Sequence, residues 1–301
     1  MHKNQVLNFI YEQEEIRIDI LITKLTNLSR ANAQNLILQK KVLIDNNLVS
    51  KKNQIVKTGQ KVEIFNDYQS PKPSLVPAEM KLEIVFQDEN ILLINKPKNL
   101  VVHPGVGNWN NTLVNGLISY FESSLFELNN VRPGIIHRLD KDTTGLILVA
   151  KNAKAHNFFT NQLANREIKR FYKAIVIGKV PHKIMKINLP IARDLKNPLK
   201  KTVSHFNSKP AITNVELIKH FNYQNKDFSL VKCQLETGRT HQIRVHLAHI
   251  GFPVYGDPVY GKKVDELGQR LHAYKVIFTN LNGKNQEFRV DLPKEFDIAF
   301  D

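Results

Sequence analysis

Residues 133–150 read Pro133-Gly-Ile-Ile-His-Arg-Leu-Asp-Lys-Asp-Thr-Thr-Gly-Leu-Ile-Leu-Val-Ala150, and this stretch decides the fold. It has an apolar start, a run of polar side chains and an apolar strand over 146–151. A polar loop that is pinned at both ends in this way positions reactive groups. The same residues also fit a plain turn in which Asp and Thr side chains bond to backbone amides. The spacing alone leaves both interpretations open.

A second polar segment is Glu236-Thr-Gly-Arg-Thr-His-Gln-Ile-Arg-Val-His-Leu-Ala-His-Ile-Gly251, which predicts a helix over 240–250 that Thr237-Gly238 is expected to open. Arg244 lies between two apolar residues in this helix, so we expect its guanidinium to be partly buried. A buried guanidinium needs a carboxylate, and Asp140 is the natural candidate. A basic face exposed to solvent is the alternative.

Around these two segments the chain predicts an α+β domain. A β-hairpin is expected from strands over 82–86 and 91–95, with the turn at 87–90. Further strands are predicted over 146–151, 171–178, 212–219, 228–236, 274–278 and 287–290, and further helices over 112–121 and 154–165. Strands and helices do not alternate regularly, which favours a mixed or antiparallel sheet.

A proline-rich segment marks a domain boundary. Three prolines lie within residues 71–77, and they favour an extended linker over a helix or a central strand. We therefore expect a small domain over 14–70, a linker over 71–80 and a larger domain over 81–301.

The small domain is predicted to hold two short helices and small strands. Apolar residues recur at helical spacing from Ile18 to Leu28, and Ser29 is expected to cap a second helix. The second helix should turn Leu36 and Ile37 inward. Residues 42–49 predict a hairpin that turns at Asn46-Asn47, and residues 61–65 predict another strand.

The charge of the chain predicts a polyanionic partner. The sequence has 43 Lys and Arg against 28 Asp and Glu, a formal net charge of +15. Basic side chains that neutralise phosphates release condensed counterions, and this release drives binding to nucleic acid. A lysine-rich solvated surface is the plainer interpretation of any single cluster.

The apolar segments are too short for a membrane protein. The longest aliphatic runs, 91–94 and 146–150, fall far below the ~18 residues of a membrane span. The apolar cluster at 6–11 continues into glutamates without a cleavage site, so we expect a cytoplasmic chain. The single cysteine, Cys233, excludes an intramolecular disulfide and a multi-cysteine zinc site.

Competing chemistries find little support in the sequence. His241, His246 and His249 have a loose ligand-like spacing, but no acidic ligand is near and two arginines would repel a cation. The glycine-rich loops that bind nucleotide phosphates do not occur. Asp140 and Asp142 would lie on one side of a strand, unlike a glycosidase pair. We therefore expect no metal and no cofactor.

His137-Arg-Leu-Asp-Lys-Asp-Thr-Thr-Gly145 resembles the signature of the RluA family of RNA pseudouridine synthases. Other segments agree in family order: 95–105, 170–174, 237–246, 256–261 and 271–273. The resemblance covers about residues 80–295. It implies an α+β pseudouridine synthase domain with a mixed or antiparallel sheet.

Residues 14–66 are similar to the alpha-L RNA-binding module of a small-subunit ribosomal protein. Arg17-Ile-Asp19 and Ser29-Arg30 stand in matching positions, whereas Lys40-Lys41 and Asn47 stand where that module often has glycine. The similarity implies a small RNA-binding domain at this end of the chain.

Carried over residue by residue, the resemblance implies that Asp140 is the catalytic aspartate, that Tyr172 stacks on the target base and that Arg244 is the ion-pair partner of Asp140. It further implies that Arg138 enters the base stack from which the target uridine is flipped. The remaining substrate-binding residues that it implies are His137, as a support, and Arg239, as a phosphate or structural contact.

The implied reaction breaks the glycosidic carbon–nitrogen bond of a uridine, turns the uracil and joins its carbon five to the same sugar. No redox change or outside reagent is needed, so a carboxylate suffices. The carboxylate either attacks the anomeric carbon of the sugar or removes the neighbouring sugar proton, and the sequence leaves both routes open.

The implied substrate is large-subunit (23S) ribosomal RNA at its helix 69 stem-loop, as free RNA or in the large ribosomal subunit or its precursor. A sister enzyme that modifies another ribosomal RNA site or a tRNA is the alternative. A non-catalytic RNA-binding assembly protein would have no need for Asp140, Tyr172 and Arg244 together. A monomer is the default expectation.

Overall fold

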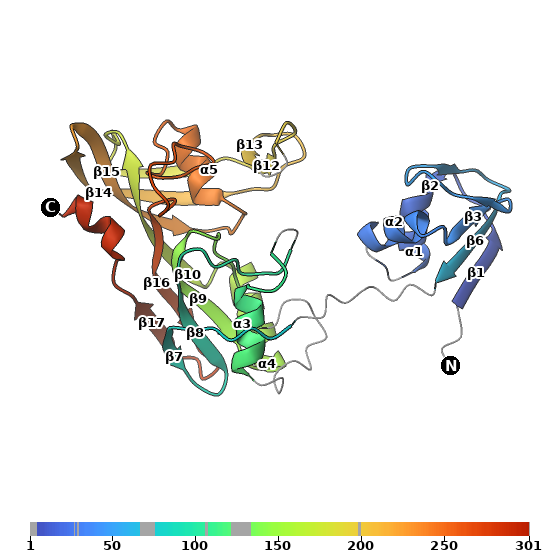
Figure 1. The fold of residues 1–301 in the computed structure, drawn as a ribbon, viewed down its shortest axis with the longest axis horizontal. Coiled ribbons are helices and arrows are strands. Elements are labelled where there is room, and N and C mark those ends of the chain that lie inside the picture. The colour runs from blue at the N-terminus through green and yellow to red at the C-terminus, as the bar shows by residue number, and fades with distance from the viewer. Residues whose placement is uncertain are drawn as a thin grey trace. The chain divides into compact units, whose positions relative to one another are not determined.

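The computed structural model describes residues 5–26, 28, 30–66, 76–105, 108–121, 134–197 and 200–300. The chain divides into two compact units, Met1–Ser74 and Leu75–Asp301, and each unit has a hydrophobic core of its own (Figure 1). No helix in the described ranges is long and apolar enough to span a bilayer.

The first unit packs two helices against small sheets. Its elements are β1 (Gln5–Ile10), β2 (Ile16–Arg17), α1 (Ile18–Leu25), α2 (Arg30–Leu38), β3 (Val42–Ile44), β4 (Asn47–Leu48), β5 (Ile55–Val56) and β6 (Lys61–Asn66). The strands form one sheet in the order β1-β6-β3-β4 and a second pair, β2-β5. Ile18 and Ile22 of α1 are fully buried, one helical turn apart, and they pack in one core with Leu36 of α2.

The two helices, the hairpin and the strand over 61–65 are confirmed in this unit. The predicted turn position is wrong by one residue, because the turn is formed by Asp45 and Asn46 at φ 49° and 62°. A two-residue hairpin needs two left-handed residues, and Asp and Asn tolerate that conformation. The proposed cap, Ser29, and the prolines at 71 and 73 lie outside the described residues.

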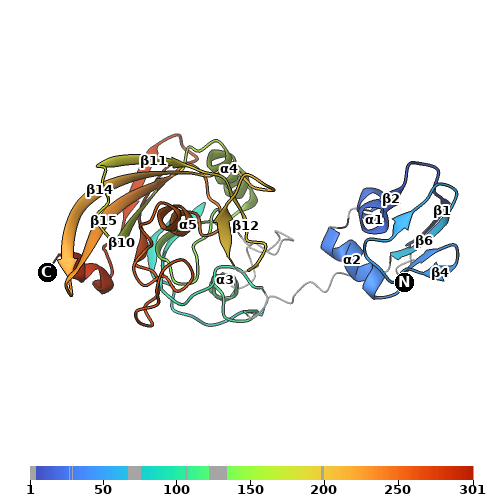
Figure 2. The same ribbon diagram turned by 90° about the horizontal axis from the view of Figure 1, so that it is seen from above.

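The second unit is built on a nine-stranded mixed sheet in the order β11-β14-β15-β10-β16-β9-β8-β7, with β17 beside β16. Its elements are β7 (Ile84–Gln87), β8 (Ile91–Lys96), α3 (Leu113–Tyr120), β9 (Thr144–Ala150), α4 (Ala153–Ala164), β10 (Lys169–Ile177), β11 (Ile184–Asn188), β12 (Ile191–Arg193), β13 (Lys201–Val203), β14 (Ile212–Tyr223), β15 (Lys226–Leu235), α5 (Gln242–His249), β16 (Leu271–Thr279), β17 (Asn285–Arg289) and a 3-10 helix, Lys294–Ala299. The expected α+β domain with a mixed sheet is confirmed, and Figure 2 shows the curvature of the sheet.

Strand β9 is buried on both faces, because a helix covers each side. Leu92 of β8 and Ile147 of β9 pack with α3, whereas Leu93 and Leu148 pack with α4. Successive side chains of a strand point to opposite faces, so a continuous apolar run is what a doubly covered strand requires. This explains why the 146–151 segment contains no polar alternation.

The predicted strands and helices of this unit are present with shifted ends. One correction concerns α5, which begins at Gln242 and not at Thr237 or at 240. His241 has φ 59°, a left-handed conformation that cannot continue a helix, so residues 237–240 form a loop before it. The short strands β11, β12 and β13 were not predicted, since three to five residues carry little periodicity.

The centre of the sheet is a close seam between β9 and β16, the one parallel pair among the described strands. Gly145 pairs with Ala273 there, and its φ is +107°. A Cβ on Gly145 would stand 2.3 Å from the carbonyl oxygen of Ala273. Only glycine fits this seam, which lies directly after the polar loop of residues 137–144.

Replacing Gly145 with alanine is expected to lower the free energy of unfolding by about 3 kcal/mol or more, because backbone strain and a backbone clash add. Gly251→Ala is the matched control: its φ is +89°, but no atom lies within 4 Å of the added Cβ. Strain alone should cost the control about 1–2 kcal/mol. Urea unfolding of both variants measures the difference, and equal losses would contradict the close seam.

Candidate active site

The loop that carries Asp140 is tied to the sheet by one buried lysine. Lys96, at the end of β8, is fully buried, and its Nζ donates to the carbonyl oxygens of Pro97 at 2.7 Å and of Leu100 and Lys141 at 3.0 Å. Burial lowers the pKa of Lys96 to about 7. Three carbonyls on one amine hold two loops at a fixed distance, so the backbone next to Asp140 is fixed in position.

The far end of the same loop is fixed by threonine side chains. Thr143 Oγ1 accepts a hydrogen bond from Gln269 Nε2 at 3.1 Å, and Thr144 Oγ1 lies 2.7 Å from His272 Nδ1. These partners lie in or beside β16. The threonines therefore bind the loop to the neighbouring strand, as expected for a loop that positions a reactive group.

The Asp140 carboxylate accepts a hydrogen bond from a side chain rather than from the amides of its own loop. Arg244 Nη1 donates to Asp140 Oδ2 at 2.9 Å, so the plain-turn interpretation is wrong for this residue. His241 Nε2 lies 3.9 Å from Oδ1, and burial lowers the pKa of the His241 ring. Asp140 thus has one oxygen held by Arg244 and one on the open side.

Arg244 is the central residue of the site. Its side chain is 5% exposed, and it donates from Nε and Nη2 to the two oxygens of Asp257 at 2.7 and 2.8 Å. The sequence predicted the burial of Arg244 and its contact with Asp140, and both are present. The two-pronged contact, however, goes to Asp257, and Asp140 receives the remaining nitrogen.

Asp257 was missed as a site residue, although its segment was singled out. It is fully buried, and it also accepts hydrogen bonds from the backbone N–H groups of Val259 and Tyr260 at 2.8 and 3.1 Å. Burial raises the pKa of Asp257, but the hydrogen bonds and charge of Arg244 and the two backbone N–H groups together outweigh it, so the net pKa lies below the usual range. An Asp–Pro pair at a turn predicts only an Asx turn, so the residues next to Asp257 gave no signal for its contact with Arg244.

The electrostatics of Arg244 and Asp257 favour ionised side chains. Burial alone would lower the pKa of Arg244, but the hydrogen bonds and charges of Asp257 and Asp140 raise it above the ordinary value. Arg244 therefore stays charged at every pH at which the protein folds. The two carboxylates and the guanidinium together have a net negative formal charge. The Asp140 oxygen that Arg244 does not contact lies on the side of the cleft.

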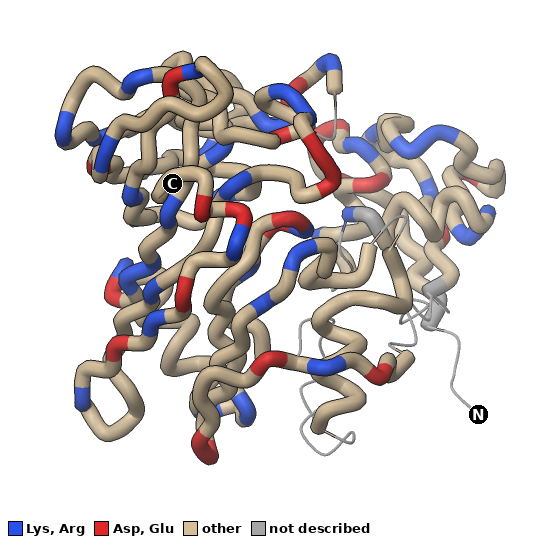
Figure 3. The backbone as a smooth tube through the Cα atoms, turned by 60° about the vertical axis from the view of Figure 1, so that its left-hand side comes forward, with Lys and Arg blue, Asp and Glu red and all other residues tan. Residues whose placement is uncertain are grey.

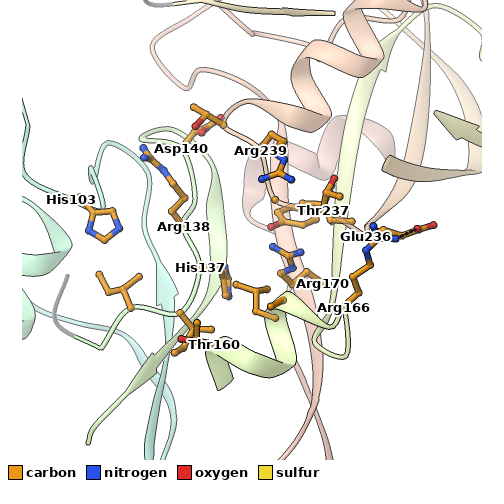
Figure 4. A pocket seen from close by; sticks show the side chains of 18 residues that line it. His103, His137, Arg138, Asp140, Thr160, Arg166, Arg170, Glu236, Thr237 and Arg239 are labelled. Carbon is orange, nitrogen blue, oxygen red and sulfur yellow. Dashed lines mark hydrogen bonds and ion pairs between the residues drawn. The ribbon is translucent and has the colours of Figure 1, made fainter. Parts of the chain in front are cut away.

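A cleft of about 500 Å³ opens beside Asp140, and Figure 4 shows the side chains that line it. Arg138, Arg166, Arg170 and Arg239 contribute to its wall, so basic side chains outnumber the two carboxylates, Asp140 and Glu236. Lysines and arginines are also spread along both units (Figure 3). Such a cleft is suited to a polyanionic substrate.

Tyr172 reaches the cleft from β10 with the help of a β-bulge. The register between β10 and β16 shifts between Phe171 and Lys173, so Tyr172 lies at the irregularity. A bulge changes the direction of a side chain and is common beside active sites. Tyr172 is buried, and burial raises the pKa of its phenol, so the ring is a neutral wall of the cleft.

The structure also brings the three other predicted residues to the cleft. Arg138 is exposed and makes no ion pair in the described part of the chain. Arg239 is half-buried, and its Nε donates to the carbonyl oxygen of Pro210 at 3.0 Å. His137 is buried, and its Nε2 accepts from the backbone N–H of Leu148 at 3.3 Å. Burial lowers the pKa of His137 to about 3, so its ring is uncharged.

The three histidines considered as metal ligands do not converge. His241 Nδ1 bonds to Tyr260 at 2.9 Å, whereas His246 uses Nδ1 for Thr213 and Nε2 for the carbonyl of Leu189, both at 2.9 Å. Within the described ranges, no group of three or more His, Cys, Asp or Glu side chains is placed to hold a metal ion.

A buried arginine that holds a carboxylate in a basic cleft is consistent with an enzyme that acts on a polyanion, and sequence similarity gives the family. Residues 90–249 match the family described as RNA pseudouridylate synthase, and residues 16–62 match the S4 domain. Since the first match covers more than half of the sequence, the chain belongs to the RNA pseudouridylate synthase family. The predicted catalytic and RNA-binding domain types are confirmed.

Individual relatives agree with the family. The chain is 42% identical over 290 residues to an uncharacterized RNA pseudouridine synthase of Bacillus subtilis, covering 94% of this chain and 93% of the relative. It is 37% identical over 295 residues to ribosomal large subunit pseudouridine synthase D of Neisseria meningitidis serogroup B, covering 93% and 76%. The human RNA pseudouridylate synthase domain containing 1 has a TM-score of 0.59 at 25% identity, covering 73% and 86%.

Arg244→Ala is expected to lower the free energy of unfolding by about 3–5 kcal/mol, because it leaves two carboxylates unpaired, one of them fully buried. Arg244→Lys should recover only part of this loss, since a lysine cannot bind both oxygens of Asp257 and still reach Asp140. Thermal and urea unfolding measure both variants. An alanine variant as stable as the wild type would contradict the central position of Arg244.

Proposed function

We propose that this enzyme converts specific uridines of large-subunit (23S) ribosomal RNA to pseudouridine, with Asp140 as the catalytic carboxylate and without a cofactor. The observation that carries the proposal is the ion-paired carboxylate of Asp140 at the edge of a basic cleft. Arg244, itself bound to Asp257, holds one oxygen of this carboxylate and leaves the other oxygen open. The names of the relatives from Neisseria and Escherichia coli support the ribosomal substrate. Within that RNA we propose the helix 69 stem-loop as the target.

The open oxygen of Asp140 acts on the sugar of the target uridine. It attacks the anomeric carbon or takes the neighbouring sugar proton, and in both routes the bond from that carbon to nitrogen one breaks. After the uracil turns, the anomeric carbon bonds to carbon five. In the first route its bond to the Asp140 oxygen breaks at this step, and in the second route Asp140 returns the proton to the sugar. Carbon five loses a proton, and nitrogen one gains a proton. Atoms and electrons balance without an oxidant or a second substrate. Arg244 keeps its hydrogen bond to the other oxygen throughout.

The other cleft residues hold the target nucleotide. Tyr172 stacks on the uracil, because a base taken from a helix loses stacking that an aromatic ring can replace. Arg138, which is exposed at the rim, enters the vacated base stack. Arg239 contacts a phosphate, and His137, as an uncharged ring, supports the wall behind the base.

The first unit adds affinity for structured RNA. Residues 1–70 contain ten Lys and Arg against seven Asp and Glu, and they include the S4 match. Basic side chains on a separate unit add phosphate contacts without affecting the chemistry. We take the division into a domain over 14–70, a linker over 71–80 and a catalytic domain over 81–301 as part of this proposal. A cytoplasmic monomer acting on ribosomal RNA or its precursor particle completes it.

Cells that lack the gene are expected to lose pseudouridine at specific 23S positions, and the wild-type gene should restore it. Asp140→Asn should restore none, because it keeps the shape of the carboxylate and removes its charge. Asp142→Asn is the matched control in the same loop, and it should restore modification, since Asp142 does not line the cleft. Chemical mapping of pseudouridine in ribosomal RNA measures all four strains.

Restoration by Asp140→Asn would remove Asp140 from the reaction. Loss of pseudouridine from tRNA or from another ribosomal site, with helix 69 unchanged, would contradict the proposed target and leave the chemistry in place. Immunoblots establish that the variants accumulate to equal levels.

A further inference from the structure

Three arginines of the second unit are buried among the described residues, and two of them have carboxylate partners. Arg244 pairs with two aspartates, and Arg270 pairs with Asp265 and the carbonyl oxygen of Gly268. Arg170 is 6% exposed, yet no hydrogen bond or ion pair joins it to any described residue, and its Nε is buried without an acceptor. Burial lowers the pKa of Arg170, since no carboxylate offsets the loss of hydration. An unpaired buried cation is costly to a fold.

Arg170 faces the cleft that also contains the reactive carboxylate. It lies two residues before Tyr172 on β10, and both side chains line the cleft. Figure 4 shows the guanidinium between His137 and Thr237. Gly238 closes over it: a Cβ there would stand 2.8 Å from Arg170 Nη1, so the absence of a side chain leaves room for the guanidinium.

The charged groups around Arg170 cannot neutralise it. The two carboxylates that line the cleft are already paired, Asp140 with Arg244 at 2.9 Å and Glu236 with Arg166 at 3.4 Å. Glu236 also pairs with Lys186 at 3.0 Å. The protein thus places a desolvated positive charge at the cleft wall without supplying an anion of its own.

We propose that Arg170 binds a backbone phosphate of the RNA substrate next to the target nucleotide. The inference rests on the proposed function, because RNA is the anion that the cleft would hold. A guanidinium donates two parallel hydrogen bonds to a phosphate, and it does so most strongly where water is excluded. Since Arg170 lies beside Tyr172, the bound phosphate fixes the position of the nucleotide whose base Tyr172 contacts.

Arg170→Met tests the proposal, because methionine keeps an unbranched apolar side chain and removes the guanidinium with its charge. Lys169→Met is the matched control: Lys169 is the neighbouring residue, it is exposed, and its Nζ donates to the carbonyl oxygen of Arg166. The dissociation constant for a ribosomal RNA fragment should rise about 10-fold in Arg170→Met, the effect of one charged hydrogen-bond pair. The slope of log affinity against log salt should fall by about 0.7–0.9, as for one phosphate. The control should stay close to the wild type in affinity.

A series of RNA fragments, each with one neutral methylphosphonate linkage, locates the contact. Wild-type protein should lose affinity for one linkage next to the target uridine, and Arg170→Met should lose no more for that linkage. If the loss of affinity from Arg170→Met adds to the loss from the neutral linkage at every position tested, the inference is overturned. Isomerisation of the unmodified fragment is measured in parallel. If the wild type is active but Arg170→Met loses affinity for the neutral linkage as the wild type does, the phosphate contact alone is rejected. If the wild type is inactive, the proposed function is rejected.

The melting temperature separates binding from a structural role. Removing an unpaired buried charge should leave the melting temperature of Arg170→Met equal to or above that of the wild type. Unfolding of this variant would show that Arg170 stabilises the fold, and Arg170→Lys would then be tested instead. The inference is overturned if Arg170→Lys also unfolds, or if it folds but its affinity does not depend on the one linkage next to the target uridine. Inorganic phosphate should not raise the melting temperature of the wild type relative to chloride at equal ionic strength. A rise that Arg170→Met lacks would assign the site to a free anion instead.

Discussion

Burying the guanidinium of Arg244 removes its N–H groups from water, and the active site depends on how they are compensated. Asp257, fully buried and itself fixed by two backbone N–H groups, takes two of them and sets the plane of the guanidinium. With the plane fixed, the remaining nitrogen, Nη1, donates its hydrogen bond to Asp140. The position of the Asp140 carboxylate is therefore decided by a residue that lies outside the cleft.

The sheet brings the partners of this interaction together from distant parts of the chain. Asp140 precedes β9, and Arg244 lies on α5, which packs through Ile243 and Leu247 on the core formed with β10 and β15. The seam at Gly145 lets β9 and β16 approach closely enough for Thr144 to reach His272. A basic cleft around one ion-paired carboxylate follows, and its charge suits an RNA substrate.

Much of this was readable in the sequence, because long apolar runs and polar loops have strong local signals. The buried run after Gly145 predicted β9, and the apolar neighbours of Arg244 predicted its burial. Asp257 was not predicted as a site residue, since its role depends on a partner 13 residues away across a loop. The predicted start of α5 was wrong because His241 has a left-handed backbone conformation. Its ring bonds to Tyr260, and helix propensity carries no signal for this contact. The unpaired state of Arg170 is a property of the fold, and sequence spacing carries no signal for it.

If Asp257 orients Asp140 through Arg244, the effect will be seen in the single-turnover rate of Asp257→Asn on saturating RNA. Asparagine keeps the shape of the side chain but loses the charge that fixes Arg244, so the rate should fall about 100-fold, the effect of a misplaced catalytic group. The dissociation constant for RNA should stay unchanged, because Asp257 does not line the cleft. Near-ultraviolet circular dichroism verifies the fold. A folded variant that isomerises uridine at the wild-type rate would contradict the account.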